Sequence, residues 1–477
     1  MKLDELLKII SSDNAPDICF DSRIVKQGNV FIAINGTAYD GHNFIDSAIE
    51  NGAEFVVTQK PHDCKDARVI VVEDTAYSAA LLAQAKYGKP ASKLTNLAVT
   101  GTNGKTTVAF LVQSIIKSAK QKCGLISTVL YDTGQANFPA NLTTPDCVTI
   151  AKTQQQMLDA GSKFMVLEAS SHALFQNRLA NINFKAAAFT NLSGDHLDYH
   201  KTEENYLAAK TLLFENMLPD QTAVLNKQSP HTEQIAQNTK ADILWFAVDE
   251  PADITAHIES MDITGTGFTL EYGRQSQKTK TSLPGRYNVS NCLAAAGLCL
   301  AAGFDLKTIA EGIRALKSIP GRLEKVEGFD DFSVLVDYAH TDDALKNVLS
   351  SLKPLCKGKL ILVFGCGGDR DETKRPRMAV VAEQLADIVI VTSDNSRTEH
   401  PAIIIGEIAL GFENPASATI INEIDRKKAI ATAIKIASEG DIVLIAGKGH
   451  ETYQIIGNKK IDFNDKEIAR QYLKNIV

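Results

Sequence analysis

Residues 98–107 read AVTGTNGKTT, and this stretch decides how the chain is expected to fold. A short apolar run leads into a loop with two glycines, and the periodic apolar segment VAFLVQSIIKSAK follows directly. This order predicts a strand, a tight loop and a helix. Gly101 and Gly104 allow the loop to turn its main-chain N–H groups inward, where they can surround phosphate oxygens.

The residues that complete this loop favour a bound nucleotide over an empty turn. Lys105 offers a positive charge to the β- and γ-phosphates of a nucleotide, and the hydroxyl of Thr106 can bind Mg²⁺. The stretch is a variant of the usual GxxxxGK[ST] pattern, because Val99 stands where the first glycine would be. A glycine turn without a ligand is the plainer alternative. The strand–loop–helix context that the motif requires favours the phosphate loop.

Outward from this loop, the chain divides into three zones. Residues 1–92 mix short apolar strands with a helix near 43–51, and YGKPASKLT, residues 87–95, is typical of a linker. Residues 93–321 alternate strands and helices, which predicts a mostly parallel sheet covered by helices. Residues 322–477 repeat this alternation and predict a Rossmann-like domain, which begins at the arginine of SIPGR. We therefore expect an α/β fold in three domains.

The composition is that of an ordinary globular protein without a general attraction to polyanions. The 477 residues are 44% apolar and 22% charged, and the formal net charge is −7. This balance argues against binding to nucleic acid or to acidic membranes. No run of about 18 apolar residues occurs, and the N-terminal MKLDELLKII lacks the apolar core of a signal peptide. The eight cysteines show no CxxC pair and no zinc spacing. We expect a cytoplasmic protein with reduced thiols, and a monomer.

Two further strand ends carry side chains suited to a divalent metal ion. LEASSHA, residues 167–173, ends an apolar run at Glu168, and TNLSGDHLDYH, residues 190–200, follows another run and contains His196. Carboxylate and imidazole groups can bind such an ion. An ordinary surface carboxylate and a hydrogen-bonded structural histidine are the plainer alternatives.

Lys210 interrupts an apolar helix predicted over residues 205–214, NYLAAKTLLF. Helical spacing places Tyr206 and Lys210 on one face of this helix. A protonated lysine cannot bind a metal ion, but its neutral amine could add CO₂ and become an anionic carbamate. From the spacing alone, a surface lysine whose aliphatic stem lies along apolar neighbours is the plainer alternative.

In the third zone, each of three apolar runs leads into a polar loop: LILVFGCGGDRD, DIVIVTSDNSR and DIVLIAGKGHE. In open α/β sheets, ligands bind at the carboxyl ends of the strands, so these loops are expected to meet. They offer Arg370, Asn395, Arg397, Lys448 and Glu451. Arginines suit carboxylates and a glutamate suits an amine, so the loops predict a site for a zwitterion. A phosphate loop that faces such a site suggests activation of an acid for attack by an amine.

Taken together, the motifs resemble those of the Mur ligases, in order and over nearly the whole chain. They are GTNGKTT, LEASSHA, TNLSGDHLDYH, NYLAAK, LPGRYNVSN, IPGR, VDYAHTDDAL, GCGGDRDETKRP and GKGHET. The resemblance is greatest to the family member that adds the third amino acid of the peptide. It implies a cytoplasmic, ATP-dependent ligase of peptidoglycan precursor synthesis. ATP would phosphorylate the terminal carboxylate of UDP-MurNAc-L-Ala-D-Glu, an amino group of the incoming amino acid would attack the acyl phosphate, and a tetrahedral intermediate would lose phosphate.

The resemblance also implies a role for each domain and each motif. The first domain would bind the UDP moiety, the central domain ATP and the third domain the amino acid. The catalytic residues would be Lys105, Glu168, His196 and Lys210. Mg²⁺ would be held by Thr106, Glu168, His196 and Lys210, the last as N6-carboxylysine. ATP would contact Gly101, Thr102, Asn103, Gly104, Lys105, Thr106, Thr107, Asn288, Asn291, Arg322, Asp337 and His340. UDP-MurNAc-dipeptide would contact Phe20, Ser22, Thr37, Ala38, Tyr39, Thr143, Thr144, Ser170, Gln176 and Arg178. The amino acid would contact Arg370, Asp394, Asn395, Ser396, Arg397, Gly447 and Glu451.

The loop at residues 394–397 reads DNSR and bears on which amino acid is added. In family members that add meso-diaminopimelate this loop reads DNPR, whereas members that add lysine usually lack the arginine. meso-Diaminopimelate carries a distal carboxylate as well as a distal amine, and a guanidinium suits the carboxylate. We therefore expect meso-diaminopimelate, with L-lysine or another diamino acid as the alternative.

Two other kinds of function remain open on the sequence. A different ligase of the same superfamily could add D-Ala-D-Ala or extend folylpolyglutamate, but DNSR and GKGHE argue against both. A nucleotide switch or small-molecule kinase would form no amide, and the polar strand-end loops of the third domain would then have no role.

Overall fold

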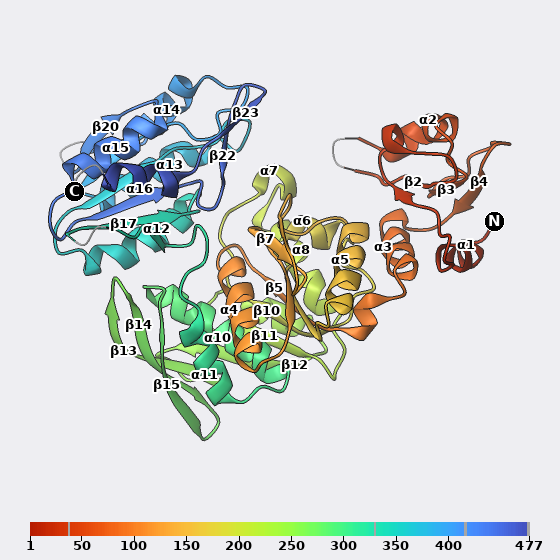
Figure 1. Ribbon diagram of the computed structural model, residues 1–477, viewed down its shortest axis with the longest axis horizontal. Helices are drawn as coiled ribbons and strands as arrows, with labels where there is room; N and C mark the ends of the chain where they lie inside the picture. Colours follow the sequence, from red (N-terminus) through yellow and green to blue (C-terminus); the bar gives the residue numbers. More distant parts are fainter. Residues whose placement is uncertain (37–38, 329–330, 415–416, 475–477) are drawn as a thin grey trace.

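The computed structural model describes residues 1–36, 39–328, 331–414 and 417–474, and Figure 1 shows three α/β units in a row. The N-terminal unit holds a parallel sheet in the order β1-β2-β3-β4. Its strands are β1 (Ile18–Cys19), β2 (Val30–Ile32), β3 (Phe55–Thr58) and β4 (Arg68–Val71). Its helices are α1 (Leu3–Ile10), η1 (Ser22–Ile24), η2 (Gly41–Phe44), α2 (Ile45–Glu50) and α3 (Thr75–Lys86), and η3 (Pro90–Lys93) follows them.

The central unit is built on one large sheet in the order β15-β14-β13-β12-β11-β10-β5-β9-β6-β7-β8. The strands from β12 to β6 pair in parallel, as expected. The strands are β5 (Thr95–Thr100), β6 (Cys123–Ile126), β7 (Leu130–Asp132), β8 (Asn137–Pro139), β9 (Phe164–Glu168), β10 (Phe184–Phe189), β11 (Thr222–Asn226), β12 (Asp242–Val248), β13 (Ile254–Asp262), β14 (Gly265–Tyr272) and β15 (Gln275–Thr281).

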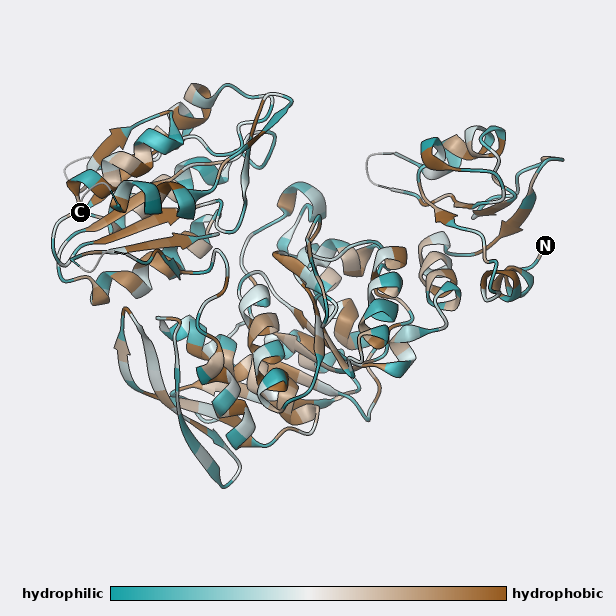
Figure 2. Cartoon of the chain, viewed as in Figure 1, coloured by the Kyte–Doolittle hydropathy of each residue, from teal (hydrophilic) through white to brown (hydrophobic). Residues whose placement is uncertain are grey.

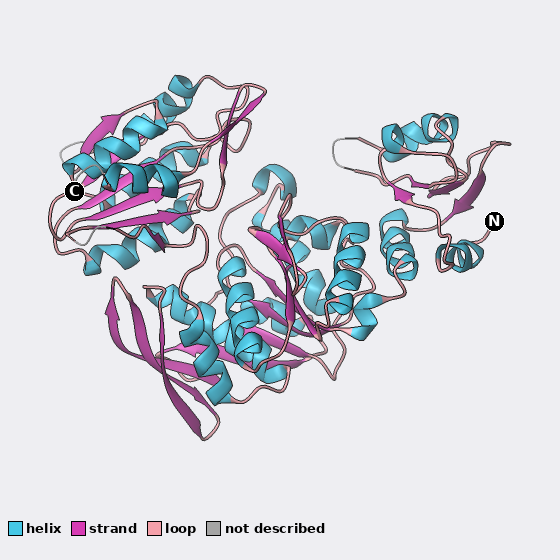
Figure 3. Cartoon of the chain, in the orientation of Figure 1, coloured by secondary structure: helices cyan, strands magenta, loops and turns pink. Residues whose placement is uncertain are grey.

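Helices cover this central sheet, as Figure 3 shows. They are α4 (Lys105–Ser118), α5 (Cys147–Asp159), α6 (Ser171–Phe175), α7 (Leu197–His200), α8 (Glu203–Glu215), α9 (Thr232–Gln237), α10 (Arg286–Ala301) and α11 (Leu306–Ala315). The antiparallel ribbon of β13, β14 and β15 was not foreseen from the sequence. Its outer strand β15 reads QSQKTKT and is mostly exposed, so it carries no apolar run that would mark a strand.

The C-terminal unit has a six-stranded sheet in the order β16-β17-β21-β18-β19-β20. Its strands are β16 (Glu324–Lys325), β17 (Ser333–Asp337), β18 (Leu360–Phe364), β19 (Ile388–Val391), β20 (Thr419–Asn422) and β21 (Ile442–Ala446), and a separate hairpin joins β22 (Tyr453–Ile456) to β23 (Lys459–Asp462). Its helices are α12 (Asp342–Leu352), η4 (Lys353–Leu355), α13 (Lys374–Leu385), α14 (Pro401–Ala409), α15 (Arg426–Ile436) and α16 (Asp465–Leu473).

Both faces of the C-terminal sheet are buried, which explains the continuous apolar runs in the sequence. Leu360, Leu362 and Phe364 of β18 belong to one core, whereas Ile361 and Val363 belong to the core on the opposite face. Figure 2 shows these strands as a hydrophobic band. The sheet is parallel except for β16, so the loops after β18, β19 and β21 emerge at one edge, as predicted.

The units touch at two places that position the site. Helix α3 packs against α5, and Gln84 of α3 donates a hydrogen bond to Gln154 of α5 at 2.7 Å. At the second junction, Gly321 adopts a φ of 66°, and a Cβ there would lie 2.1 Å from the main-chain nitrogen of His450. Glycine is therefore needed where the central and C-terminal units meet. Among the described residues, no helix has the length and apolar character needed to cross a membrane.

Candidate active site

The phosphate loop has the conformation that its sequence predicts. Strand β5 ends at Thr100, Gly101 and Gly104 take φ angles of 143° and 90°, and α4 begins at Lys105. A Cβ on Gly101 would lie 1.9 Å from Oγ1 of Thr190, and a Cβ on Gly104 would lie 2.2 Å from Oδ1 of Asn291. The loop therefore packs closely against Thr190 and Asn291, and both positions require glycine.

Two lysines converge on the carbonyl of Gly101. The Nζ atoms of Lys105 and Lys210 donate hydrogen bonds to it at 2.9 and 2.8 Å, and Lys105 also donates to the carbonyl of Thr102 at 2.8 Å. Burial lowers the pKa of Lys105, and the charges of Glu168 and Asp195 partly offset this decrease. Burial and the charge of Lys105 lower the pKa of Lys210 well below its ordinary value. The loop thus places two amines where anionic oxygens would be attracted.

Lys210 is not a surface residue. It lies on α8, is 1% exposed, and its Nζ is 4.3 Å from the ring centroid of Tyr206, one turn earlier. The predicted shared face of Tyr206 and Lys210 is confirmed by this contact. A lowered pKa favours the neutral amine, which can act as a nucleophile or a ligand, whereas a protonated lysine cannot.

Glu168 is a fully buried carboxylate at the end of β9. Its Oε2 atom accepts hydrogen bonds from the hydroxyls of Thr106 (3.1 Å) and Thr128 (3.0 Å), and its Oε1 atom accepts one from the main chain of Thr128 (2.8 Å). No ion-pair partner lies within 4 Å of it among the described residues. A buried carboxylate beside a phosphate-loop hydroxyl has the oxygen chemistry that Mg²⁺ prefers.

The four residues expected at the metal do not all meet around one point. Thr106 and Glu168 are in contact, whereas His196 and Lys210 each border Tyr206, with the His196 and Tyr206 ring centroids 6.1 Å apart and Lys210 Nζ 4.3 Å from the Tyr206 centroid. In the described part of the chain, no group of three or more His, Cys, Asp or Glu side chains could hold a metal ion. The donor set therefore fits Mg²⁺ at Thr106 and Glu168 more directly than at His196.

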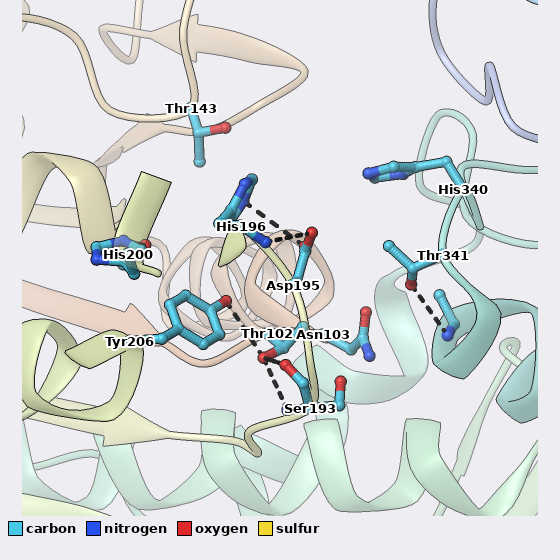
Figure 4. Close-up of polar contacts among 12 residues, drawn as sticks. Thr102, Asn103, Thr143, Ser193, Asp195, His196, His200, Tyr206, His340 and Thr341 are labelled. Carbon is cyan, nitrogen blue, oxygen red and sulfur yellow. Dashed lines mark hydrogen bonds and ion pairs between the residues drawn. The ribbon is translucent and has the colours of Figure 1, made fainter. Parts of the chain in front are cut away.

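His196 stands at the mouth of the phosphate loop in a left-handed conformation with a φ of 56°. Figure 4 shows it beside Asp195, with His340 and Thr341 of the C-terminal unit across from them. Loss of water lowers the pKa of His196 to about 4, against the opposing effect of Asp195. Burial raises the pKa of Asp195, but His196, His340 and Lys374 together lower it below its ordinary value. The mouth of the loop thus holds a neutral imidazole next to a carboxylate.

A cavity of about 710 Å³ joins the phosphate loop to the C-terminal unit. It is lined by most of the residues expected to contact ATP: Thr102, Asn103, Gly104, Lys105, Thr106, Thr107, Asn288, Asn291, Arg322, Asp337 and His340. Gly101 lies beneath this lining. Arg322 donates a hydrogen bond to the Thr106 hydroxyl at 2.9 Å and stacks on Tyr338, 4.7 Å from its ring centroid. Burial raises the pKa of Asp337 and lowers that of His340.

Asp343 of α12 is a site residue that the sequence analysis missed. Its Oδ2 atom accepts hydrogen bonds from Asn103 of the phosphate loop (2.7 Å), Ser193 (2.9 Å) and Asn347 (3.1 Å). The sequence carried one signal, since Asp343 and Asn347 are four residues apart and share a helix face. Nothing in the sequence placed that face against the phosphate loop.

The residues expected at the UDP-MurNAc-dipeptide fall into two separate groups. In the central unit, Thr143 accepts a hydrogen bond from Thr128, Thr144 donates to the carbonyl of Glu168, and Arg178 donates to the carbonyl of Thr144 and to Gln176. Ser170 caps α6 and its N–H donates to Thr144. In the N-terminal unit, Ser22 is buried, Phe20 packs on the apolar core and Tyr39 is 76% exposed. Thr37 and Ala38 lie outside the described residues.

The residues expected at the amino acid do meet, at the carboxyl edge of the C-terminal sheet. Asn395 donates to Glu451 at 2.9 Å, and the fully buried Lys448 donates to both, at 3.1 Å to Asn395 and 2.7 Å to Glu451. Arg397 donates to the carbonyl of Gly368 at 2.7 Å.

Backbone geometry fixes the two loops that carry these groups. Arg397 has a φ of 50°, and its main chain is bonded to the hairpin at Ile455 and Gly457 (3.1 and 2.7 Å). A Cβ on Gly447 would lie 2.8 Å from Asp394, so the loops touch. Ser396 is buried and its hydroxyl has no hydrogen-bond partner among the described residues. Arg370 is exposed and borders Gly367 beside Arg397.

The fold and the site define a three-domain enzyme in which a phosphate loop on one domain opens into a polar cleft completed by another. Residues 17–97 match the Mur ligase family, catalytic domain, residues 99–299 the Mur ligase middle domain, and residues 321–449 the Mur ligase, glutamate ligase domain. The chain belongs to the Mur ligase family, whose members are ATP-dependent ligases.

Named relatives match this chain over nearly its whole length. A Bacillus licheniformis protein named UDP-N-acetylmuramoyl-L-alanyl-D-glutamate–2,6-diaminopimelate ligase is 42% identical, with 99% of each chain covered. A solved structure of a ligase of that name is 32% identical with a TM-score of 0.67, covering 96% of this chain and 95% of that one. The MurF ligase of Thermotoga maritima in complex with ADP has the same fold, with a TM-score of 0.67 at 19% identity, covering 99% of this chain and 100% of that one.

Proposed function

We propose that the protein adds meso-diaminopimelate to UDP-MurNAc-L-Ala-D-Glu at the expense of ATP. The observation that carries this proposal is the cluster at the edge of the C-terminal sheet. There, Arg397 and Arg370 flank Gly367, and Glu451 is held by Asn395 and Lys448. Such a site offers guanidinium groups to carboxylates and a carboxylate to an amine. The name of the Bacillus licheniformis relative supports the same amino acid.

The nucleotide would lie along the cavity between the central and C-terminal units. The main-chain N–H groups of residues 101–107 and the start of α4 would hold its phosphates, because a helix N-terminus attracts anions. Lys105 would leave the carbonyls of Gly101 and Thr102 and pair with the phosphate oxygens. Asn288 and Asn291 would border the base, and Asp337 and His340 would meet the nucleotide from the C-terminal side.

Chemistry would begin when the terminal carboxylate of the nucleotide-sugar dipeptide attacks the γ-phosphorus of ATP. The P–O bond to ADP breaks, and an acyl phosphate forms. The neutral amine of the amino acid then attacks the acyl carbon, the tetrahedral intermediate expels phosphate, and the ammonium proton is lost. Lys105 would spread the negative charge that gathers on the transferred phosphoryl group. His196, kept neutral beside Asp195, could take up a proton at the mouth of the loop.

Mg²⁺ would be held by Thr106 and Glu168, and when bound it neutralises charge on phosphate oxygens. The neutral Lys210 amine could add CO₂, losing one proton to give a carbamate that adds an anionic oxygen ligand near the phosphate loop. Its burial against Tyr206 and its low pKa support this role. His196 would complete this region from the loop before α7.

The nucleotide-sugar dipeptide would extend from the N-terminal unit to the phosphate loop. Phe20, Ser22, Thr37, Ala38 and Tyr39 would contact its uridine end. Thr143, Thr144, Ser170, Gln176 and Arg178 would contact its sugar and peptide, because their hydrogen bonds lead step by step to Glu168. The UDP-binding domain would comprise residues 1–92, the ATP-binding domain residues 93–321 and the amino-acid-binding domain residues 322–477. We further propose that the protein is a cytoplasmic monomer.

Labelled amino acids test the proposal directly. Purified protein is incubated with ATP, Mg²⁺ and UDP-MurNAc-L-Ala-D-Glu, and with labelled meso-diaminopimelate or labelled L-lysine. The proposal predicts meso-diaminopimelate in the nucleotide product, with one phosphate released per amide formed. Preference for L-lysine would refute the role of Arg397, and ATP turnover without any amino acid would refute ligase activity.

A further inference from the structure

The two loops at the proposed amino-acid site emerge from strands that do not pair with each other. The loop that carries Asn395 and Arg397 follows β19, and the loop that carries Lys448 and Glu451 follows β21. In the sheet, β18 lies between β21 and β19. The two strands therefore share no main-chain hydrogen bonds in the sheet, and among the described residues the main-chain bonds of Arg397 reach only the hairpin that follows Glu451.

One fully buried side chain connects the ends of these two strands. Arg426 is the first residue of α15 and is 1% exposed. It donates hydrogen bonds to the carbonyl of Ala446 at 2.9 Å and to the carbonyl of Ser393 at 3.4 Å. Ala446 is the last residue of β21, and Ser393 is the second residue after the end of β19. The guanidinium thus bonds to the carboxyl ends of two strands that β18 separates in the sheet.

A second buried group fixes the orientation of this guanidinium. Asp465, the first residue of α16, accepts from Nε of Arg426 at 2.8 Å and from Nη2 at 2.7 Å, and neither side chain is exposed. This fork-to-carboxylate geometry holds the plane of the guanidinium. Gln454 adds a further contact at the same place, since its amide donates to Ser393 Oγ at 3.0 Å and to the Asp394 carbonyl at 2.9 Å.

We infer that Arg426 is a positioning residue for amino-acid specificity, through the carbonyls of Ser393 and Ala446. It sets the separation between the guanidinium of Arg397 and the carboxylate of Glu451, and so the length of diamino acid that both can hold. The inference rests on the proposed function, since it assigns those two groups to the two ends of the substrate. Shifts of about 1 Å in such a site change rates by about 100-fold.

Arg426→Lys tests the inference, because lysine keeps the charge beside Asp465 but has one nitrogen in place of the planar fork that bonds to Asp465 and to both carbonyls. We expect the KM for meso-diaminopimelate to rise by about tenfold or more, the KM for ATP to stay unchanged, and the preference over L-lysine to fall. The double variant Arg426→Met/Asp465→Leu replaces the buried ion pair with apolar side chains, which preserves folding in many proteins. It should show the same pattern if Arg426→Lys does not fold.

Ile430→Ala is the matched control, because Ile430 is fully buried on the same helix and belongs to the apolar core on one face of the sheet. It should lower the thermal midpoint and leave the KM values unchanged. An unchanged KM for the diamino acid in a folded Arg426 variant would overturn the inference, as would an equal rise in Ile430→Ala. If the wild-type protein uses L-lysine instead, the proposed substrate is wrong, and the KM for L-lysine then tests Arg426 in the same way.

Discussion

At the scale of single residues, burial determines which side chains can perform the chemistry. Lys210 illustrates this, since its helix spacing fits a surface lysine as well as a ligand, and only the packed structure removes its water. Arg397 is different, because the ability of its guanidinium to bind a carboxylate follows from its charge alone. The sequence could therefore predict Arg397 as a binding group, whereas the lowered pKa of Lys210 depends on its burial in the packed structure and on the charge of Lys105 nearby.

Arg397→Ala should raise the KM for meso-diaminopimelate by about 10- to 100-fold, which corresponds to one lost charge-assisted hydrogen bond. The KM for ATP should change little, since Arg397 lies outside the cavity at the phosphate loop. Steady-state kinetics with each substrate varied in turn gives both constants. Arg470→Ala is the control, because among the described residues Arg470 forms an ion pair with Glu467 alone, on the outer part of α16. A proportional rise in both KM values would contradict the assigned role.

Lys210→Ala should lose most of its activity and regain part of it when short carboxylic acids are added. The added acid would supply the anionic oxygen that a carbamate supplies in the wild-type protein. Turnover is measured as phosphate release with and without acetate. Lys201→Ala, the control, removes an exposed lysine beside α8. It should keep its activity without any added acid. Absence of rescue at every acid concentration would contradict the carbamate.

At the scale of elements, the strand–loop–helix unit around residues 98–107 was predictable because its signals are local. The apolar strand, the two glycines and the periodic helix each follow from neighbouring residues. The ribbon of β13, β14 and β15 was not predictable, because β15 is polar and is ordered by pairing with β14. The contact that Asp343 of α12 makes was likewise not predictable from neighbouring residues, since its partner Asn103 lies 240 positions away in the sequence.

Helix α8 should make stability depend on pH through Lys210. Its pKa is lowered in the folded protein, so between that pKa and the ordinary 10.5 the unfolded chain binds more protons. The free energy of unfolding from Lys210 therefore rises with pH across this window. Urea unfolding at pH 7 and pH 9 should show a smaller rise for Lys210→Met than for the wild-type protein. An equal rise in both proteins would mean that Lys210 is charged when folded.

At the scale of the whole molecule, the account requires that residues from two domains complete one site. Asp343 of the C-terminal unit bonds to Asn103 and Ser193 of the central unit, and Arg322 reaches Thr106. The order of the three α/β units was predictable from where apolar runs and linkers fall. The approach of the central and C-terminal units was not predictable, because their contacts described here involve single polar residues without a pattern along the chain.

Asp343→Ala should loosen the junction between the central and C-terminal units in the absence of nucleotide. The loss of the two hydrogen bonds that cross the junction leaves Asn103 and Ser193 without this partner, so the radius of gyration from X-ray scattering should increase. Asp342→Ala is the neighbouring control, since Asp342 pairs with Arg377 inside the C-terminal unit at 3.1 Å. Equal scattering from Asp343→Ala and the wild-type protein would show that this contact does not hold the domains together.

The most direct test of the central claim is a crystal structure of the protein with meso-diaminopimelate bound. We expect the distal carboxylate to lie within hydrogen-bond distance of the Arg397 guanidinium, and Glu451 to accept a hydrogen bond from an ammonium group of the same molecule. A structure in which the diamino acid is bound while Arg397 points into solvent would contradict the claim.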